Sequence, residues 1–350
     1  MTEALSSLLL GDADDGRRWS MPDEGEPHKR TWMAFGASKD VWGRRLLPQV
    51  RHDLALIATT ISRFEPVSML VRPDELDIAR HLIGGANVEL VVAQLDDLWI
   101  RDTGPVFVKG DHGRAGVDFN FNGWGKKQRH RYDRKVAEVV ARRAGIEPLP
   151  TELTLEGGGI EVDGEGTAII TESCVLNNNR NRGWKKEDVE AELRYLLGLE
   201  KIIWLPGIAG FDITDGHTDF YARFAGPGVV VAGLDNDPDS FDYEVTRAHL
   251  DILQSQTDAR GRELRVEVIE GPTEVRPQFD SEDFAAGYIN FYVCNGAVIA
   301  PGFGDFAADS AARATLQRLF PDRQVVQIPI DGIAAGGGGI HCTTQQEPVG

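Results

Sequence analysis

Four segments of this chain share one arrangement, in which a polar residue stands at the head of a short β-hairpin. Each first run of β-forming residues is followed by a glycine-containing or polar turn and then by a second such run. The heads recur roughly every 50 to 75 residues, a period typical of solenoids and propellers. A fifth unit begins near Trp32, and the four heads are Asp102, Glu156, His217 and Asn290.

Helical stretches alternate with these hairpins. Six segments carry apolar residues at helical spacing, namely 44–63, 73–83, 134–144, 185–197, 242–254 and 309–320. If every hairpin starts near a common axis, the head residues enter one shared cavity although they lie far apart in the sequence. The pattern therefore predicts a repeated α/β architecture of the propeller or solenoid kind. The alternative is an ordinary α/β sheet in which the repetition is accidental.

The chain is long enough to bury a sizeable core. Its 350 residues, of which 41% are hydrophobic, would fill one large domain or two smaller ones. Residues 1–20 are a polar lead-in that we expect to be mobile. No linker rich in serine and proline follows them, so residues 21–350 are predicted to form a single domain that carries the shared cavity.

The charge balance excludes one class of partner. A formal net charge of −18 leaves no basic footprint for phosphate, so nucleic acid is not an expected ligand. An acidic surface attracts small cations, although it could equally serve only to keep the protein in solution. The apolar run Leu8–Leu10 is too short for a signal peptide or a membrane span, which predicts no membrane partner and a cytoplasmic location.

The three cysteines form no recognisable metal or disulfide pattern. No two have the short spacing of a zinc site, and their odd number argues against a disulfide framework. The chain also lacks a P-loop and a His-Glu-x-x-His motif, so neither a metal nor a cofactor is expected. Cys174 and Cys294 lie in apolar segments typical of strands, and we expect both to be structural.

Cys342 has a different setting. It follows the glycine run 336–339, whose bare backbone another group can approach closely, and it precedes Thr-Thr-Gln-Gln. A free cysteine is more often a buried packing residue than a nucleophile. The glycines and the polar neighbours nevertheless favour a nucleophile at this position.

Acidic residues accompany the most promising imidazole. On a strand, His217 and Asp219 would face the same side, where the carboxylate can orient the ring or help to hold a cation. Glu156, before three glycines, could accept hydrogen bonds from a planar cation or from His217. Asp102 lies near Trp99, whose ring face could hold a guanidinium. Each motif could also be an ordinary turn, but together they suit covalent attack by a thiol on a cationic carbon.

The sequence gives weaker evidence for the positions and roles of three other residues. Asn290 could hydrogen-bond a substrate or serve only the fold. Glu161 lies near a hairpin turn and is expected on the surface. His341, next to Cys342, is expected to face away from the site if its segment is extended.

Taken together and in this order, these motifs resemble the agmatine deiminase family, which also includes bacterial-type peptidylarginine deiminases. The resemblance covers most of the chain and rests on the stretches 21–28, 99–105, 156–159, 214–219, 290–292 and 336–348. It implies a five-bladed α/β propeller of the pentein type, with the active site on the pseudo-fivefold axis. It also implies a hydrolase without a cofactor and a possible homodimer.

The resemblance assigns roles to the residues of the cluster. The nucleophile falls on Cys342, the general acid/base on His217, and the glutamate that orients the histidine on Glu156. The carboxylates that bind the guanidinium fall on Asp102 and Asp219. The implied reaction is attack of the thiolate on the guanidinium carbon, loss of ammonia, and hydrolysis of the covalent thiouronium intermediate.

The identity of the substrate is less constrained than the chemistry. The resemblance favours agmatine, which would be hydrolysed to N-carbamoylputrescine and ammonia. Phe35–Ser38, Ile213 and Gly339 depart from the agmatine deiminase pattern. Arg223, next to the site, could bind a substrate carboxylate or pair with a neighbouring acid. The alternatives are therefore deimination of arginine, methylated arginine or peptidyl-arginine, transfer of the amidino group to an amine, and a propeller that binds without catalysis.

Overall fold

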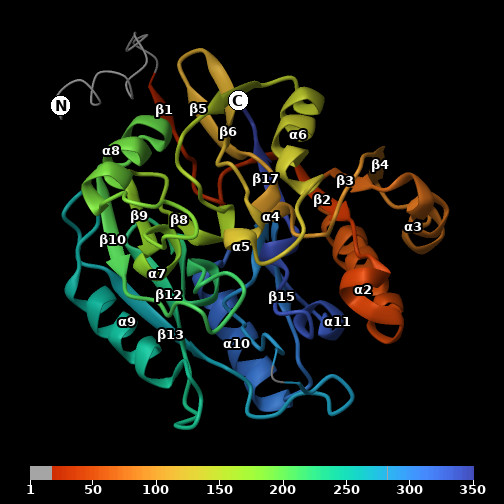
Figure 1. Ribbon diagram of the computed structural model, residues 1–350. Helices are drawn as coiled ribbons and strands as arrows, with labels where there is room; N and C mark the ends of the chain where they lie inside the picture. Colours follow the sequence, from red (N-terminus) through yellow and green to blue (C-terminus); the bar gives the residue numbers. More distant parts are fainter. Residues whose placement is uncertain (1–17, 282) are drawn as a thin grey trace.

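The described part of the chain is a mixed α/β structure whose strands form five separate sheets of three or four strands each. The computed structural model describes residues 18–281 and 283–350. In Figure 1 the longer helices lie towards the periphery, while the short helices α4 (Ile100–Thr103) and α5 (Gly123–Lys126) lie near the middle. Within the described ranges, no helix combines the length and the apolar character that a membrane span requires.

Four of the sheets are built in the same way. An antiparallel hairpin is followed by a helix and then by a strand that pairs in parallel with the second hairpin strand. The connecting helices are α6 (Val136–Ala144), α8 (Lys186–Leu197), α9 (Tyr243–Ser255) and α10 (Phe306–Leu319). The strands are β5 (Val106–Gly110), β6 (Gly113–Asp118) and β7 (Glu147–Pro150); β8 (Ile160–Val162), β9 (Thr167–Thr171) and β10 (Lys201–Leu205); β11 (Ala222–Gly226), β12 (Val229–Leu234) and β13 (Arg265–Glu270); and β14 (Tyr292–Cys294), β15 (Ala297–Pro301) and β16 (Gln324–Ile328).

The fifth sheet joins the two ends of the described chain. β17 (Gln345–Pro348) pairs antiparallel with β2 (His28–Phe35), and β3 (Val67–Val71) and β4 (Val88–Val92) continue the sheet in parallel. The crossovers contain α2 (Lys39–Ile61) and then η1 (Pro73–Glu75) with α3 (Leu76–Ile83). The unit predicted near Trp32 therefore exists, but its first strand comes from the last residues of the chain.

The predicted hairpins and helices are confirmed. All four hairpins are present, and the described strands do not form one continuous sheet. The six predicted helical stretches correspond to α2, α3, α6, α8, α9 and α10, with ends that shift by a few residues. Local chemistry explains several of these ends. The Asp305 side chain accepts hydrogen bonds from two backbone N–H groups in the first turn of α10, and Gly145 and Gly198 end α6 and α8 with positive φ.

The amino-terminal boundary differs from the prediction. Most of the expected lead-in, residues 1–17, lies outside the described residues. Trp19 and Ser20 form β1, which pairs antiparallel with β5. Trp19 is buried in an apolar cluster with side chains of β5, β6 and α8. The predicted boundary at residue 20 is therefore wrong for its last residues, because the apolar Trp19 belongs to the folded core.

Short helical turns stand at the heads of the sheets. The turn α4 precedes β5, and the 3-10 turns η3 (Gly157–Gly159), η4 (Thr218–Phe220) and η5 (His341–Thr343) precede β8, β11 and β17. The turn α4 packs against η3 and η5, and η3 packs against η4. The separate sheets thus bring their leading segments into mutual contact.

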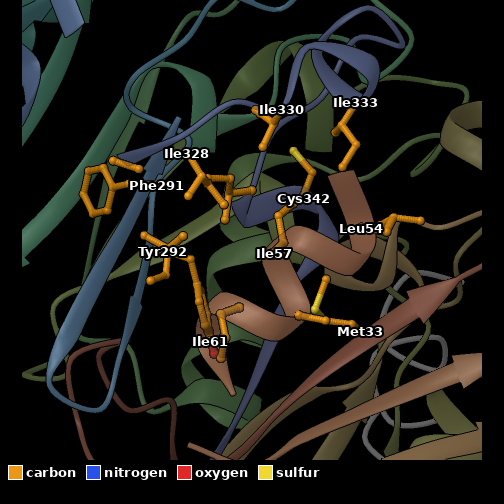
Figure 2. Packing of buried hydrophobic residues seen from close by; sticks show 14 of the residues in the cluster. Met33, Leu54, Ile57, Ile61, Phe291, Tyr292, Ile328, Ile330, Ile333 and Cys342 are labelled. Carbon is orange, nitrogen blue, oxygen red and sulfur yellow. The ribbon is translucent and has the colours of Figure 1, made fainter. Parts of the chain in front are cut away.

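A large apolar cluster fixes the segment that carries Cys342. Figure 2 shows side chains of α2 and β2 packed against those of the β14–β16 sheet and of the segment that follows it. Burying one large aliphatic side chain contributes roughly 1.5–3 kcal/mol to folding. Cys342 belongs to this cluster and also contacts polar residues, so apolar packing positions a side chain of the polar site.

Candidate active site

The head segments of all five sheets contribute to one buried polar cluster. Its residues come from α4, from the positions just before or within η3 and η4, from the start of the β14 hairpin and from η5. The structure brings together Asp102 (7% exposed), Glu156 (0%), His217 (2%), Asp219 (0%), Asn290 (0%) and Cys342 (7%).

Gly158 lets the backbone approach three of these side chains at once. A Cβ atom at this position would lie 2.6 Å from His217 Nδ1, 2.9 Å from Asp102 Oδ1 and 3.2 Å from Asp219 Oδ2. Distances this short leave no room for a methyl group, so the reason for glycine here is close approach rather than an unusual φ. Gly158 therefore belongs to the site, as the bare backbone after Glu156 suggested.

Asp102 is held by a backbone donor and by an indole. Gly158 N donates to its Oδ1 at 3.0 Å, and Trp124 Nε1 donates to its Oδ2 at 2.9 Å. Burial raises the pKa of Asp102, the nearby His217 opposes this rise, and the carboxylates of Glu156 and Asp219 add to it. A cation beside Asp102 would oppose this rise and favour the ionised carboxylate.

Asp219 offers a free acceptor. Its Oδ2 lies 2.8 Å from His341 Nδ1, whereas its buried Oδ1 has no hydrogen-bond partner. Burial acts to raise the pKa of Asp219, but the hydrogen bond and charge of His341 outweigh burial and lower it. An ionised carboxylate with one unsatisfied buried oxygen is an unusual feature, because buried polar atoms are normally paired.

Glu156 and Arg180 support the imidazole. His217 Nε2 lies 3.2 Å from Glu156 Oε2, and His217 Nδ1 lies 3.8 Å from Asp102 Oδ1. Arg180 Nε donates to both carboxylate oxygens of Glu156. Burial opposes the charged form of His217, but the carboxylate of Asp102, the Cys174 sulfur and Glu156 outweigh it and hold the pKa of His217 well above its usual range. The ring is therefore suited to donate a proton.

Cys342 lies between an amide and a carboxylate. Its Sγ is 3.2 Å from Asn290 Nδ2 and 3.5 Å from Asp219 Oδ2. Burial raises the pKa of the Cys342 thiol well above its usual range, and Asp219 and Asp102 raise it further. The thiolate, which is the nucleophilic form, therefore requires a positive charge nearby.

A second thiol lies beside the same imidazole. Cys174, in α7 (Glu172–Val175) rather than in the predicted strand, is fully buried, and its Sγ lies 3.5 Å from Glu156 Oε2. Burial raises the pKa of Cys174 as well. Cys294, by contrast, lies within strand β14, as its sequence context predicted.

His341 does not face away from the cluster as expected. The prediction assumed an extended segment, but residues 341–343 form the 3-10 turn η5. His341 Nδ1 therefore contacts Asp219, while its Nε2 lies 3.0 Å from Glu24 Oε2. Glu24 was missed, although it lies in one of the family stretches. Burial opposes its ionisation, but Arg223 and His341 hold the pKa of Glu24 well below its usual range.

Of the two roles left open for Arg223, the structure shows the pairing with neighbouring acids. Arg223 is fully buried, and its Nε donates to Glu161, its Nη1 to the Phe291 carbonyl and its Nη2 to Glu24, at 2.7–2.8 Å. A guanidinium with these three partners is a structural cross-link rather than a free anion receptor. Glu161, expected on the surface, is consequently buried as its counter-charge.

The two tryptophans near Asp102 have different surroundings. Trp99 packs on Trp42, with ring centroids 5.8 Å apart, and its Nε1 donates to Asp97. Its role as a platform for a guanidinium stays a prediction. Trp124, which the sequence reasoning missed, contacts Asp102 directly, and it does so from a backbone with φ of +52°. The glycines at 123 and 125 on either side of it were the available signal.

Known proteins resemble this chain in both sequence and fold. The sequence model of the family described as Porphyromonas-type peptidyl-arginine deiminase matches residues 20–348. The agmatine deiminases of Pseudomonas aeruginosa (strain LESB58) and Pseudomonas putida (strain KT2440) are each 39% identical, with 95% and 94% of this chain and 96% and 95% of those proteins covered. A solved agmatine deiminase of Enterococcus faecalis is 33% identical, with a TM-score of 0.87 over 95% of this chain and 96% of that one. The chain therefore belongs to the Porphyromonas-type peptidyl-arginine deiminase family, which includes the agmatine deiminases that its motifs resemble.

Proposed function

We propose that this protein is a guanidine deiminase that hydrolyses agmatine to N-carbamoylputrescine and ammonia through a covalent intermediate on Cys342. The observation that carries this proposal is the unpartnered Oδ1 of Asp219, buried beside Cys342, where a guanidinium N–H would satisfy it. The names of relatives that are 39% identical over nearly the whole chain support agmatine as the substrate.

Binding of the guanidinium rests on two carboxylates. Asp102 and Asp219 both contact the position of Gly158 and so lie on the same side of the cluster. His341 occupies Asp219 Oδ2, which leaves Oδ1 to accept from the substrate. Charge-assisted hydrogen bonds of this kind are roughly twice as strong as those between neutral groups. They would fix the plane of the guanidinium against Cys342.

The cation also helps to form the nucleophile. Without it, burial and two carboxylates keep the pKa of the Cys342 thiol high. A guanidinium between Asp102 and Asp219 neutralises these charges and stabilises the thiolate. Attack is therefore favoured only when substrate is bound, which protects the thiol from other reactions.

The reaction then proceeds in two halves. The Cys342 thiolate forms a bond to the guanidinium carbon, and His217 gives a proton to one terminal nitrogen, which leaves as ammonia. This leaves a thiouronium cation on Cys342. Neutral His217 next takes a proton from water, the hydroxide adds to the same carbon, and the carbon–sulfur bond breaks with loss of a proton to solvent. The products are the ureido compound, the Cys342 thiolate and protonated His217.

Cys342 is favoured over Cys174 as the nucleophile by the carboxylate that each thiol contacts. Asp102 lies on the Nδ1 side of His217, whereas Glu156 lies at Nε2. Cys174 contacts Glu156, whose charge is already matched by Arg180. Cys342 contacts Asp219, which has a free oxygen for the substrate. Asn290, as a donor to Cys342, would position the thiol rather than the substrate.

The alternatives differ in what holds the rest of the substrate. Arginine carries a carboxylate, and the residue suggested to bind it, Arg223, is engaged by Glu24 and Glu161. This favours agmatine, which has no carboxylate. Amidino transfer would use the same cluster but would require an amine acceptor.

A substrate panel tests the proposal. Ammonia release would be measured with agmatine, arginine, methylated arginines and an arginine peptide, with Cys342→Ala as the control. We expect cysteine-dependent ammonia from agmatine. Release only from a carboxylate-bearing substrate would reject agmatine, and turnover only in the presence of an added amine would support amidino transfer.

The repeated sheets also suggest how the fold is arranged around the site. We infer that the five sheets are the blades of a five-bladed propeller, with the cluster on its axis, and that residues 19–350 are one catalytic domain. Support comes from the repeated order of hairpin, helix and parallel strand and from the contacts among the leading turns. A homodimer and a cytoplasmic location stay predictions.

A further inference from the structure

Cys174 is a thiol that the proposed mechanism does not use, yet it lies against two residues that the mechanism requires. Its Sγ is 3.5 Å from Glu156 Oε2, and His217 Nε2 is 3.2 Å from the same oxygen. The three atoms all lie within 4.8 Å of one another, and all three residues are buried. A sulfur, an imidazole nitrogen and a carboxylate oxygen together are the donor set that zinc prefers.

We propose that Glu156, Cys174 and His217 form an inhibitory site for Zn²⁺. With a zinc–sulfur bond of about 2.3 Å and zinc–oxygen and zinc–nitrogen bonds of about 2.0 Å, a tetrahedron places sulfur and oxygen about 3.5 Å apart and nitrogen and oxygen about 3.3 Å apart. The separations of 3.5 Å and 3.2 Å match these two edges. The third edge, from Cys174 Sγ to the His217 ring nitrogen, is at most 4.8 Å and would have to shorten to about 3.5 Å on binding.

The surroundings of the three ligands suit a metal. A histidine that binds a metal commonly turns its other ring nitrogen towards a carboxylate, and His217 Nδ1 faces Asp102 at 3.8 Å. Arg180 fixes the carboxylate of Glu156 in place. Its positive charge opposes a cation, but the carboxylates of Asp102 and Asp219 nearby attract one.

A glycine keeps one flank of this site free of side-chain atoms. A Cβ atom at Gly159 would lie 3.5 Å from Cys174 Sγ and 3.8 Å from His217 Cδ2. The ligands come from three segments with no standard zinc spacing between them, which is why the sequence did not reveal the site.

Occupancy would stop catalysis. Zinc would bind as the Cys174 thiol and the Nε2–H of protonated His217 each lose a proton to solvent, so that the sulfur and the ring nitrogen can both donate a lone pair to the metal. Glu156 can then no longer accept a hydrogen bond from His217, and the ring can no longer exchange a proton with leaving group and water. Removal of the metal by a chelator would restore the free imidazole. The inhibitory effect rests on the proposed function, whereas the binding of the metal does not.

Cobalt binding tests the site without reference to activity. Co²⁺ would be titrated into the Cys342→Ala variant, which lacks the other thiol of the cluster, and the near-ultraviolet thiolate-to-cobalt absorption band recorded. We expect a band in Cys342→Ala and in Cys342→Ala/Cys294→Ala, and none in Cys342→Ala/Cys174→Ala. Absence of a band in the single variant, or its persistence without Cys174, would overturn the site.

Zinc inhibition tests the consequence. Ammonia release would be measured against Zn²⁺ in buffer without thiols, with the metal-free rate of each variant as its own reference. The apparent inhibition constant is expected to rise at least about tenfold in Cys174→Ala, and EDTA should restore the wild-type rate. Cys294→Ala, which also removes a buried free cysteine, should be inhibited by zinc with the same apparent inhibition constant as wild type. Equal inhibition of wild type and Cys174→Ala would reject the inhibitory role. If the enzyme released no ammonia from any substrate, the cobalt result would still decide the metal site.

Discussion

Arg180 Nε donates to both carboxylate oxygens of Glu156, at 2.9 and 3.0 Å, and both side chains are fully buried. Burial opposes ionisation of Glu156, but the charge of Arg180 and the contact with His217 lower its pKa. Arg180 also donates to Asp215 at 2.7 Å, in the turn just before His217. Arg180 is thus a positioning residue: it holds Glu156, which contacts the His217 ring, and it holds the turn that precedes His217.

We expect Arg180→Gln to lower both stability and activity. Loss of the guanidinium leaves Glu156 as a buried carboxylate without its counter-charge, which costs about 3–5 kcal/mol of unfolding free energy. The rate constant kcat should fall at least tenfold, roughly 1.4 kcal/mol, when measured where the variant is folded. Urea unfolding and steady-state kinetics would check both values.

The matched control for that variant is Arg142→Gln. Arg142 pairs with Glu138 on an exposed helix face, and such pairs contribute about 0–1 kcal/mol. If Arg180→Gln changed the unfolding free energy and kcat no more than the control does, the ionised form of Glu156 would not depend on Arg180.

Gly158→Ala should lower kcat/KM roughly a hundredfold while the protein still folds. The added methyl group would push against His217, Asp102 and Asp219, and a misplacement of catalytic groups by about 1 Å can reduce the rate roughly a hundredfold. Measurement of kcat/KM would report the loss of catalysis, and circular dichroism would show whether the protein is still folded. Gly85→Ala is the control, because nothing lies within 4 Å of a Cβ atom there. Near-normal kcat/KM in Gly158→Ala would show that the close approach is dispensable.

The choice between the two thiols can be made by mass spectrometry during turnover. We expect the intermediate, an amidino adduct of the intact protein, to form in Cys174→Ala and to be absent from Cys342→Ala. Loss of the nucleophile should reduce kcat at least about a thousandfold. An adduct on Cys342→Ala would place the covalent step on another residue.

The sequence predicted what depends on local pattern and missed what depends on distant contacts. The hairpin headed by His217 and the helix at 309–320 follow from the order of residues over one short segment, and both are present. Arg223 and Glu161 are 62 positions apart, and only the folded chain shows that they pair in the interior. Because burial of a charge requires a partner, the burial of Glu161 and the choice between the two roles of Arg223 could not be decided from the neighbouring sequence.

In the active site, too, residues with a local sequence signal were predicted, and residues that act through distant contacts were missed. The motif containing Cys342 carried its own signal, a run of glycines before a thiol. Trp124 and Arg180 contact Asp102 and Glu156 from distant segments. The glycines beside Trp124 were a signal of an unusual backbone, but only the structure shows which residues these two side chains contact.

The environment of His249, which lies outside the active site, leads us to expect that the folded protein loses stability in acid. It is buried, with Nε2 accepting from Gly207 N at 3.1 Å, Nδ1 without a partner and the ring edge against Tyr221. Burial lowers the pKa of His249 from 6.5 to about 4. Between these values the unfolded chain binds a proton that the folded chain does not, so stability falls as pH drops from 6.5 towards 4 and this contribution is constant below 4. At pH 4.5 the loss amounts to roughly 2–3 kcal/mol.

Replacement of His249 by glutamine isolates this contribution. The amide oxygen can still accept from Gly207 N, but the side chain has no proton to gain in this range. Urea unfolding of wild type and His249→Gln at pH 7.5 and pH 4.5 gives the difference between their pH dependences, in which the carboxylates common to both cancel. We expect the variant to lose roughly 2–3 kcal/mol less than wild type over this range, whatever its stability at pH 7.5. Equal losses in the two proteins would mean that His249 takes up a proton in the folded state as readily as in the unfolded one.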